Sequence, residues 1–294
     1  MASVPKVVKQ LLQEQIAHDI QINGSQTLGG GCINHAVKLS TSQGDYFVKW
    51  NDNCPRDLFL REAESLEELA KPDTAFVVPR VIAATELTDD DPGAIITEYL
   101  PPATNRSKGE DEQLGTGLAQ LHRFRGDKFG FYHNNYCGAT LQNNDWNDNW
   151  INFFGQQRIQ YLLDLIRDSR SLGGDEQKTY QRLIDKLPEL IGHEPEPALN
   201  HGDLWSGNYM YTQKGPALID PASYYADREF DLSIVNMFGG FSDTFWNAYQ
   251  EAYPLPPEWR SRNDLYMIYH YLNHYYLFGG SYGQQAMGIA KRFI

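Results

Sequence analysis

Residues 199–208 read LNHGDLWSGN, and residues 217–223 read ALIDPAS. An aspartate such as Asp203 can accept a proton from a hydroxyl group, and the oxygens of Asn208 and Asp220 suit a hard divalent cation. Two strand-like segments joined by a turn at residues 213–215 separate the stretches, so the chain returns to the same place. The alternative is that these residues only cap or form turns. Their combination favours a cation-dependent site.

The spacing within this site is typical of phosphoryl transfer. Asp203 and Asn208 stand five residues apart, as Asp and Asn do in a kinase-type catalytic loop. We therefore expect Asp203 to orient the acceptor hydroxyl and to take its proton. Asn208 and Asp220 are the expected Mg²⁺ ligands.

Residues earlier in the chain fit a nucleotide. Gly29, Gly30 and Gly31 would let the backbone approach phosphates closely, although the run matches neither GxGxxG nor GxxxxGK[ST]. Lys49 follows on a predicted strand and Glu62 lies in the next predicted helix, an order that holds the α- and β-phosphates in kinases. Taken alone, the two residues are equally consistent with an exposed lysine and a solvated helix face.

Hydrophobic periodicity divides the chain into two parts. The first part has helical patterns at residues 4–18 and 56–70, and strand patterns at residues 33–40, 45–50, 77–84 and 93–100. After a Pro-rich polar stretch, helical patterns dominate, at residues 110–124, 148–169, 175–191, 231–236, 243–252 and 258–278. Short strand-like pieces interrupt them at residues 197–220. The pattern predicts an α+β fold with two lobes, residues 1–98 and 99–294.

Several segments resemble the fructosamine-3-kinase (ketosamine-3-kinase) family, notably HGDLWSGN, IDPASYYADREFDLSIVNMFGGF and YHYLNHYYLFG. GGGCINHAVKL, FVKW, REAESLEEL and NDWNDNWINFFGQQRI are similar to it too, so the resemblance covers nearly the whole chain. HGD and DPA are shared with aminoglycoside and choline kinases, whereas the tryptophan, the MFGGF block and the YLNH block are more particular. The resemblance implies a bilobal protein-kinase-like fold: a small antiparallel-sheet lobe with a helix binds the nucleotide, and a larger, mainly helical lobe carries catalysis and substrate binding.

The resemblance also implies an activity. Members of this family use ATP and Mg²⁺ to phosphorylate the 3-hydroxyl of the sugar in a ketoamine, and the unstable product sheds the sugar, which is deglycation. The implied partners are ketoamine small molecules or glycated proteins. Carried over position by position, the implied roles are the catalytic aspartate (Asp203), the metal ligands (Asn208, Asp220), the phosphate-orienting pair (Lys49, Glu62) and the hinge whose backbone meets adenine (Glu98, Tyr99, Leu100).

The sugar is expected to lie next to Asp203. Trp205 could offer it an apolar face, or could pack in the core. In the last predicted helix His270, Asn273, His274 and Leu277 share one stripe, which is more polar than a buried stripe should be. The resemblance points to His274 as a substrate contact, whereas a lone helical histidine is more often structural.

Three further features have two interpretations each. Asp231 precedes an apolar helix and is expected to cap it or to support the catalytic loop. The segment DWNDNW, residues 145–150, caps a helix or lines the acceptor site. Cys32 follows the glycines and is either redox-active or a harmless small residue.

Composition excludes several classes of protein. The net charge is −13 and the sequence pI is about 5.0, so no basic face for nucleic acid is expected. Three scattered cysteines form no disulfide framework and no CxxC zinc motif. No apolar stretch is long enough to span a membrane, and the N-terminus lacks the apolar core of a signal peptide. A cytoplasmic protein is expected.

The alternatives to a ketosamine kinase are a kinase for another amine-bearing acceptor, such as an aminoglycoside or choline, a metal-dependent phosphohydrolase built on His201, Asp203 and Asp220, and a non-catalytic ATP-binding scaffold. The MFGGF and YLNH blocks argue against the first. A phosphohydrolase usually needs more clustered His and Asp ligands. The intact catalytic positions argue against a scaffold.

Overall fold

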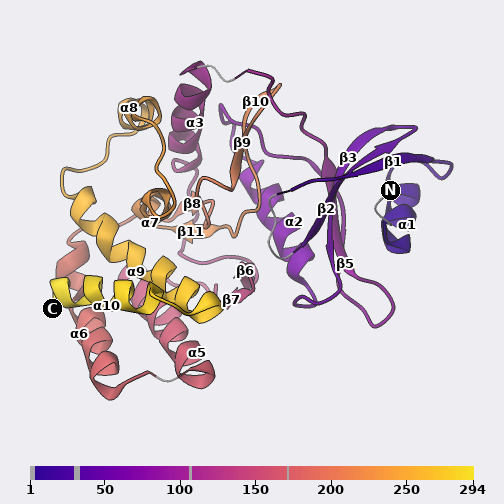
Figure 1. The fold of residues 1–294 in the computed structure, drawn as a ribbon. Helices are drawn as coiled ribbons and strands as arrows, with labels where there is room; N and C mark the ends of the chain where they lie inside the picture. The colour runs from indigo at the N-terminus through magenta and orange to yellow at the C-terminus, as the bar shows by residue number, and fades with distance from the viewer. Residues whose placement is uncertain (1–3, 30–33, 106–107, 171) are drawn as a thin grey trace.

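A computed structural model describes residues 4–29, 34–105, 108–170 and 172–294 of the chain. Figure 1 shows a sheet with two helices built from the first third of the chain, and a larger, mainly helical part built from the rest. This arrangement confirms the predicted α+β architecture. The last strand of the sheet ends at Glu98, and we propose the boundary between the two parts there.

The sheet of the first part has five strands, in the order β1-β2-β3-β5-β4, and every neighbouring pair is antiparallel. The strands are β1 (Ile22–Thr27), β2 (His35–Thr41), β3 (Gly44–Asn51), β4 (Val81–Thr85) and β5 (Gly93–Glu98). β1 was not predicted, because its residues INGSQT lack the alternation of a half-buried strand.

The two helices of this part contact different residues of the sheet. α1 (Lys6–Gln15) packs in one apolar cluster with Val48 and Trp50, and α2 (Leu58–Leu69) packs in another with Ile95. Because side chains alternate along a strand, Lys49 lies on the opposite face of β3 from Val48 and Trp50. Its neighbour across the sheet is Ile95, so Lys49 is turned toward α2.

The second part is built around one apolar cluster of helices and loops. Its helices are α3 (Lys108–Leu121), α4 (Trp150–Asn152), the π-helix η1 (Phe153–Gln160), α5 (Tyr161–Ser169), α6 (Gly174–Ile191), α7 (Arg228–Ser233), the 3₁₀ turn η2 (Ile234–Asn236), α8 (Asp243–Ala252), α9 (Trp259–Phe278) and α10 (Tyr282–Phe293). The helix predicted at residues 231–236 begins earlier, and α10 was not predicted. None of the helices in the described residues is long and apolar enough to cross a membrane.

Three antiparallel two-stranded ribbons position the polar loops of this part. They pair β6 (Asn135–Cys137) with β7 (Thr140–Gln142), β8 (Ala198–Asn200) with β11 (Tyr224–Ala226), and β9 (Tyr209–Thr212) with β10 (Gly215–Leu218). The β9–β10 ribbon is the hairpin expected between the two motifs. The β6–β7 ribbon and β11 were not predicted, because strands of three residues are too short to show a period.

Candidate active site

The loop between β8 and β9 carries Asp203 and Asn208. The Asn208 side-chain amide donates to the Asp203 carboxylate at 3.0 Å and to the Asp203 main-chain oxygen at 2.8 Å. The five-residue spacing therefore closes a small loop through one side chain. Since Nδ2 of Asn208 makes these bonds, Oδ1 is the atom left to act as a ligand.

Asp220 follows β10 and returns to the same place, as the sequence predicts. Its main-chain oxygen lies 3.5 Å from the Asn208 amide, and the N–H of Ile219 donates to the Asn208 carbonyl at 2.9 Å. Asp220 has φ of +53°, and it is the only residue other than glycine with positive φ in the described part of the chain. Strained backbone of this kind concentrates at functional sites. Its side chain is 48% exposed, so one face of the carboxylate is open.

Lys49 joins this loop to the sheet. Its Nζ lies 2.7 Å from Glu62 Oε1 and 2.9 Å from Asp220 Oδ1. Burial acts to lower the pKa of Lys49, but the two carboxylates outweigh it and hold that pKa above its usual range. Burial also raises the pKa of Glu62 to about 7 despite the lysine. The structure thus brings together the two residues that were expected to pair, while their contact with a nucleotide stays a prediction.

Asp203 has an unusual pKa for an aspartate. Burial raises it to about 7, the bond from Asn208 acts against this rise, and the nearby carboxylates of Asp220 and Asp231 add to it. A carboxylate with this pKa is a stronger base than an ordinary aspartate at neutral pH.

Asp231 binds the backbone at the start of the loop between β8 and β9. Its carboxylate accepts from the backbone N–H of His201 at 2.7 Å and of Gly202 at 2.9 Å. His122 Nε2 lies 3.2 Å away and donates to it, while His122 Nδ1 accepts from Tyr249. The capping interpretation of Asp231 was wrong: it lies inside α7, which is capped by Asp227. The supporting role is what these contacts describe.

Glycine is required at two positions of the loop. A Cβ on Gly202, which has φ of +85°, would lie 2.0 Å from the carbonyl oxygen of Ala222. A Cβ on Gly207 would lie 2.2 Å from the ring of Trp205. The first glycine lets the loop between β8 and β9 pack against the segment after Asp220, and the second lets the ring of Trp205 pack over the loop.

Aromatic side chains continue from Trp205 along one wall. The Trp205 ring meets Phe238 edge-on at 5.5 Å, and Phe238 lies 5.2 Å from His274. His274 in turn contacts Phe278 at 5.8 Å and Tyr282 at 5.1 Å. We call Trp205, Phe238, His274, Phe278 and Tyr282 the aromatic wall. Phe278 and Tyr282 were missed from the sequence, because one ends α9 and the other begins the unpredicted α10.

The polar stripe of α9 has two kinds of member. His270 and Asn273 are buried and bond to protein groups, the hydroxyl of Ser233 and the carbonyl of Cys137. His274 is partly buried, and its Nδ1–H donates to the carbonyl of His270 at 2.8 Å. Burial lowers the pKa of His274, which favours the neutral ring, and Nε2 has no hydrogen-bond partner among the described residues.

The predicted hinge begins at Glu98, the last residue of β5, and continues through Tyr99 and Leu100. The Glu98 carboxylate pairs with Lys214 at 2.7 Å and accepts from the Arg80 N–H, so its side chain is engaged by protein. Leu100 is buried, and Lys38 lies over the ring of Tyr99 at 4.8 Å. The predicted adenine contact concerns the backbone here, and it stays a prediction.

The glycine-rich run is described only in part. Gly29 follows β1, is exposed, and would accept a Cβ without a clash. Gly30, Gly31 and Cys32 lie outside the described residues, so the predictions for them stay open.

In DWNDNW, Asn149 caps α4 by accepting from Asn152 N. The capping interpretation of that segment is confirmed.

No group of three or more His, Cys, Asp or Glu side chains among the described residues is arranged to hold a metal. Asn208 and Asp220 lie beside each other, and their side-chain oxygens are of the kind that suits a hard cation.

The chain is similar to known proteins over nearly its whole length. The family described as fructosamine kinase matches residues 4–294. A protein of Vibrio parahaemolyticus named as a ketoamine kinase is 38% identical over 291 residues, covering 98% of this chain and 99% of that protein. The chloroplastic protein-ribulosamine 3-kinase of Arabidopsis thaliana is 37% identical over 277 residues, covering 93% of this chain and 83% of that protein.

Solved structures agree. A crystal structure assigned as a fructosamine-3-kinase from Haemophilus somnus 129PT superposes with a TM-score of 0.86 at 27% identity, covering 98% of this chain and 96% of that one. The aminoglycoside phosphotransferase APH(4)-Ia superposes with a TM-score of 0.63 at 13% identity, covering 98% of each chain, which shows a shared fold only. With the catalytic loop, the lysine pair and this full-length match in agreement, the chain belongs to the fructosamine kinase family.

Proposed function

We propose that this kinase transfers the γ-phosphoryl group of ATP, with Mg²⁺, to the 3-hydroxyl of ketosamines such as fructosamine and ribulosamine adducts of amines. The product sheds its sugar, so the reaction leads to protein deglycation. The observation that carries the proposal is one chain of contacts: Glu62 to Lys49, Lys49 to Asp220, and Asp220 through Asn208 to Asp203. Phosphoryl transfer needs this positioning more than it needs covalent chemistry.

The phosphate end of the site consists of Lys49, Asn208 and Asp220. Asn208 Oδ1 and the open face of the Asp220 carboxylate are the proposed Mg²⁺ ligands, and the bound ion would neutralise charge on the β- and γ-phosphates. Lys49 is held fully charged by Glu62 and Asp220, so it can donate to the α- and β-phosphates. The Glu98–Leu100 backbone is proposed to receive the adenine.

The acceptor end consists of Asp203. Its carboxylate is proposed to accept the hydrogen bond of the sugar hydroxyl and to align it in line with the γ-phosphorus. In a loose transition state the proton leaves late, so the raised pKa of Asp203 serves to receive it.

The aromatic wall suits a sugar joined to an amine. Trp205 lies two residues from Asp203 and is only partly buried, so its ring can pack against a sugar face. The free Nε2 of His274 can accept from a sugar hydroxyl or from the amine N–H. The names of the relatives, ketoamine kinase and protein-ribulosamine 3-kinase, support this acceptor class. The cytoplasmic location expected from the sequence stays a prediction.

The direct test is ATP consumption with Mg²⁺ against fructosyl- and ribulosyl-lysine, with an aminoglycoside and choline as control acceptors. We expect turnover of the ketosamines and none of the controls, with the phosphate on the 3-hydroxyl by ³¹P NMR. Turnover of only the controls would overturn the acceptor assignment.

A further inference from the structure

The helix α2 carries Glu62 on one side and a different set of polar side chains on another. Asp57, Arg61, Glu64, Ser65 and Glu68 follow one another at helical spacing, so they form one stripe along the helix and the residue before it. All five contact either the helical part of the chain or a neighbour in the same stripe. The stripe is therefore the polar face by which α2 contacts the helical part.

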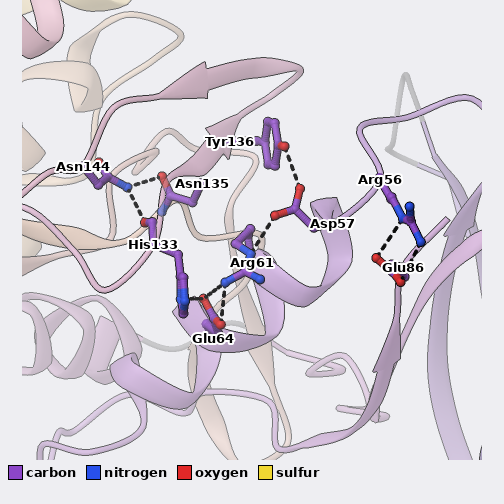
Figure 2. Close-up of polar contacts among 9 residues, drawn as sticks. All are labelled: Arg56, Asp57, Arg61, Glu64, Glu86, His133, Asn135, Tyr136 and Asn144. Atoms are coloured by element: carbon purple, nitrogen blue, oxygen red, sulfur yellow. Dashed lines mark hydrogen bonds and ion pairs between the residues drawn. The ribbon is translucent and has the colours of Figure 1, made fainter.

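Asp57 is the first member of the stripe and stands at the N-cap position of α2. An aspartate there usually accepts from a backbone N–H of the first turn, but this one makes no such bond. Its carboxylate instead accepts from the Tyr136 hydroxyl at 2.7 Å and from Arg61 at 2.9 Å (Figure 2). The Asp57 carboxylate thus binds Tyr136 of β6, in the helical part of the molecule, and does not cap α2.

Four more contacts run along the same stripe. Arg61 binds Glu64 at 2.6 Å, and His133 Nδ1 lies 3.1 Å from the Glu64 carboxylate, as Figure 2 also shows. Farther along, Ser65 accepts from the backbone N–H of Ser223 at 3.3 Å. Glu68 accepts from the Tyr225 hydroxyl at 2.8 Å.

The partners of the stripe are themselves braced against the catalytic segment. Asn135, next to Tyr136, donates to the carbonyl of Ser223 at 2.8 Å, and Ser223 is three residues beyond Asp220. Asn144 donates to Asn135 at 2.8 Å and to the His133 carbonyl at 3.1 Å. The segment that contacts α2, residues 133–136, is thus hydrogen-bonded to the segment that follows Asp220.

We propose that Tyr136 is a positioning residue for phosphoryl transfer: through Asp57 it fixes α2 in the orientation that keeps Glu62 on Lys49. The inference rests on the proposed function and extends it to a residue that acts through Asp57. Burial and the Asp57 carboxylate raise the pKa of Tyr136, so the phenol stays protonated and donates. α2 thus contacts both parts of the molecule: its apolar residues pack with Ile95 of the sheet, its polar stripe binds the helical part, and the Lys49–Glu62 pair links it to β3.

Tyr136→Phe removes one hydroxyl and leaves the ring. A hydrogen bond to a charged group supports an effect of about tenfold, seen as a higher KM for ATP and a lower kcat/KM. Asp57→Ala should give the same loss, and the double variant should be no worse than either single one. Arg56→Gln is the matched control, because Arg56 pairs at the adjacent position with Glu86 of the sheet part and should leave both constants unchanged.

A merely structural hydroxyl would lower the active fraction without changing KM. The decisive arm is therefore a Glu62→Gln background, in which Tyr136→Phe should have no further effect. A wild-type KM for Tyr136→Phe, or an equal loss with and without Glu62, would overturn the proposal. The affinity of the same variants for a non-hydrolysable ATP analogue tests independently whether Tyr136 acts through Glu62. If the wild type turned over no ketosamine, the proposed function would fail while this binding result still stood.

Discussion

Asp203 lies in the loop between β8 and β9, Asp231 of α7 binds the start of the same loop, and the surroundings of the two carboxylates differ. Asp231 is 1% exposed and accepts from His201 N, Gly202 N and His122. Burial acts to raise its pKa, but these bonds and the neighbouring histidines hold it below the usual value. Asp203 is partly buried, receives one hydrogen bond from a described side chain, that of Asn208, and has its pKa raised.

These surroundings indicate a structural role for Asp231 and a functional role for Asp203. A buried carboxylate with all its acceptors filled holds the backbone in place and has no capacity for a substrate. A carboxylate with an unfilled acceptor, placed beside a strained Asp220, is destabilised in the free protein and can be relieved by a hydroxyl donor. The fold thus uses Asp231 to fix the loop that presents Asp203.

The largest expected effect is on turnover by Asp203→Asn. The amide keeps the shape but cannot accept the proton, so kcat should fall by at least about a thousandfold. Binding of a non-hydrolysable ATP analogue should stay near the wild-type value. A variant with wild-type turnover would remove Asp203 from the mechanism.

Asp231→Asn should act on stability instead. The amide leaves His122 or a backbone N–H without its charged acceptor, and breaking such a buried arrangement lowers the free energy of unfolding by about 3 kcal/mol. Urea denaturation followed by circular dichroism measures it. A stable variant that is inactive would show that Asp231 acts in the chemistry.

Gly202→Ala tests the loop between the two aspartates. The added Cβ would meet the Ala222 carbonyl at 2.0 Å in a backbone with φ of +85°, so the free energy of unfolding should fall by about 2 kcal/mol. Gly280→Ala is the control, because φ is +68° there but no atom lies within 4 Å. Equal losses in the two variants would mean that φ alone matters.

Trp205→Ala should have the smallest effect of the four. Loss of the ring beside Asp203 should raise the KM for the ketosamine about tenfold and leave the KM for ATP unchanged. Trp146→Ala serves as control, since Trp146 is 43% exposed and packs on Tyr132 rather than on the aromatic wall. An unchanged ketosamine KM would give Trp205 the core-packing role instead.

The sequence predicts the parts of this site that follow from local spacing. Asp203, Asn208 and Asp220 converge because a five-residue loop and a short hairpin bring them back together, and Lys49 faces α2 because strand side chains alternate. The contact between Asp57 and Tyr136 could not be predicted in the same way. Its N-cap position is visible in the sequence, but its partner Tyr136 lies on a three-residue strand that has no period.

The same limit applies to the supporting groups. Asp231 reads as a cap from its position before apolar residues, and only the packing of α7 under the loop shows that it binds backbone N–H groups. The aromatic wall is likewise assembled from separate segments, including α9, α10 and the segment around Phe238. No single stretch of sequence therefore predicts it.

The most direct measurement is the free energy of unfolding of Asp203→Asn beside the wild type, at pH 8 in Mg²⁺-free buffer. The folded-state pKa of Asp203 is raised to about 7, so above that pH its charge opposes folding. Replacing the charge with a neutral amide should leave the inactive variant at least as stable as the wild type. A loss of stability as large as that of Asp231→Asn would contradict the division between a functional and a structural aspartate.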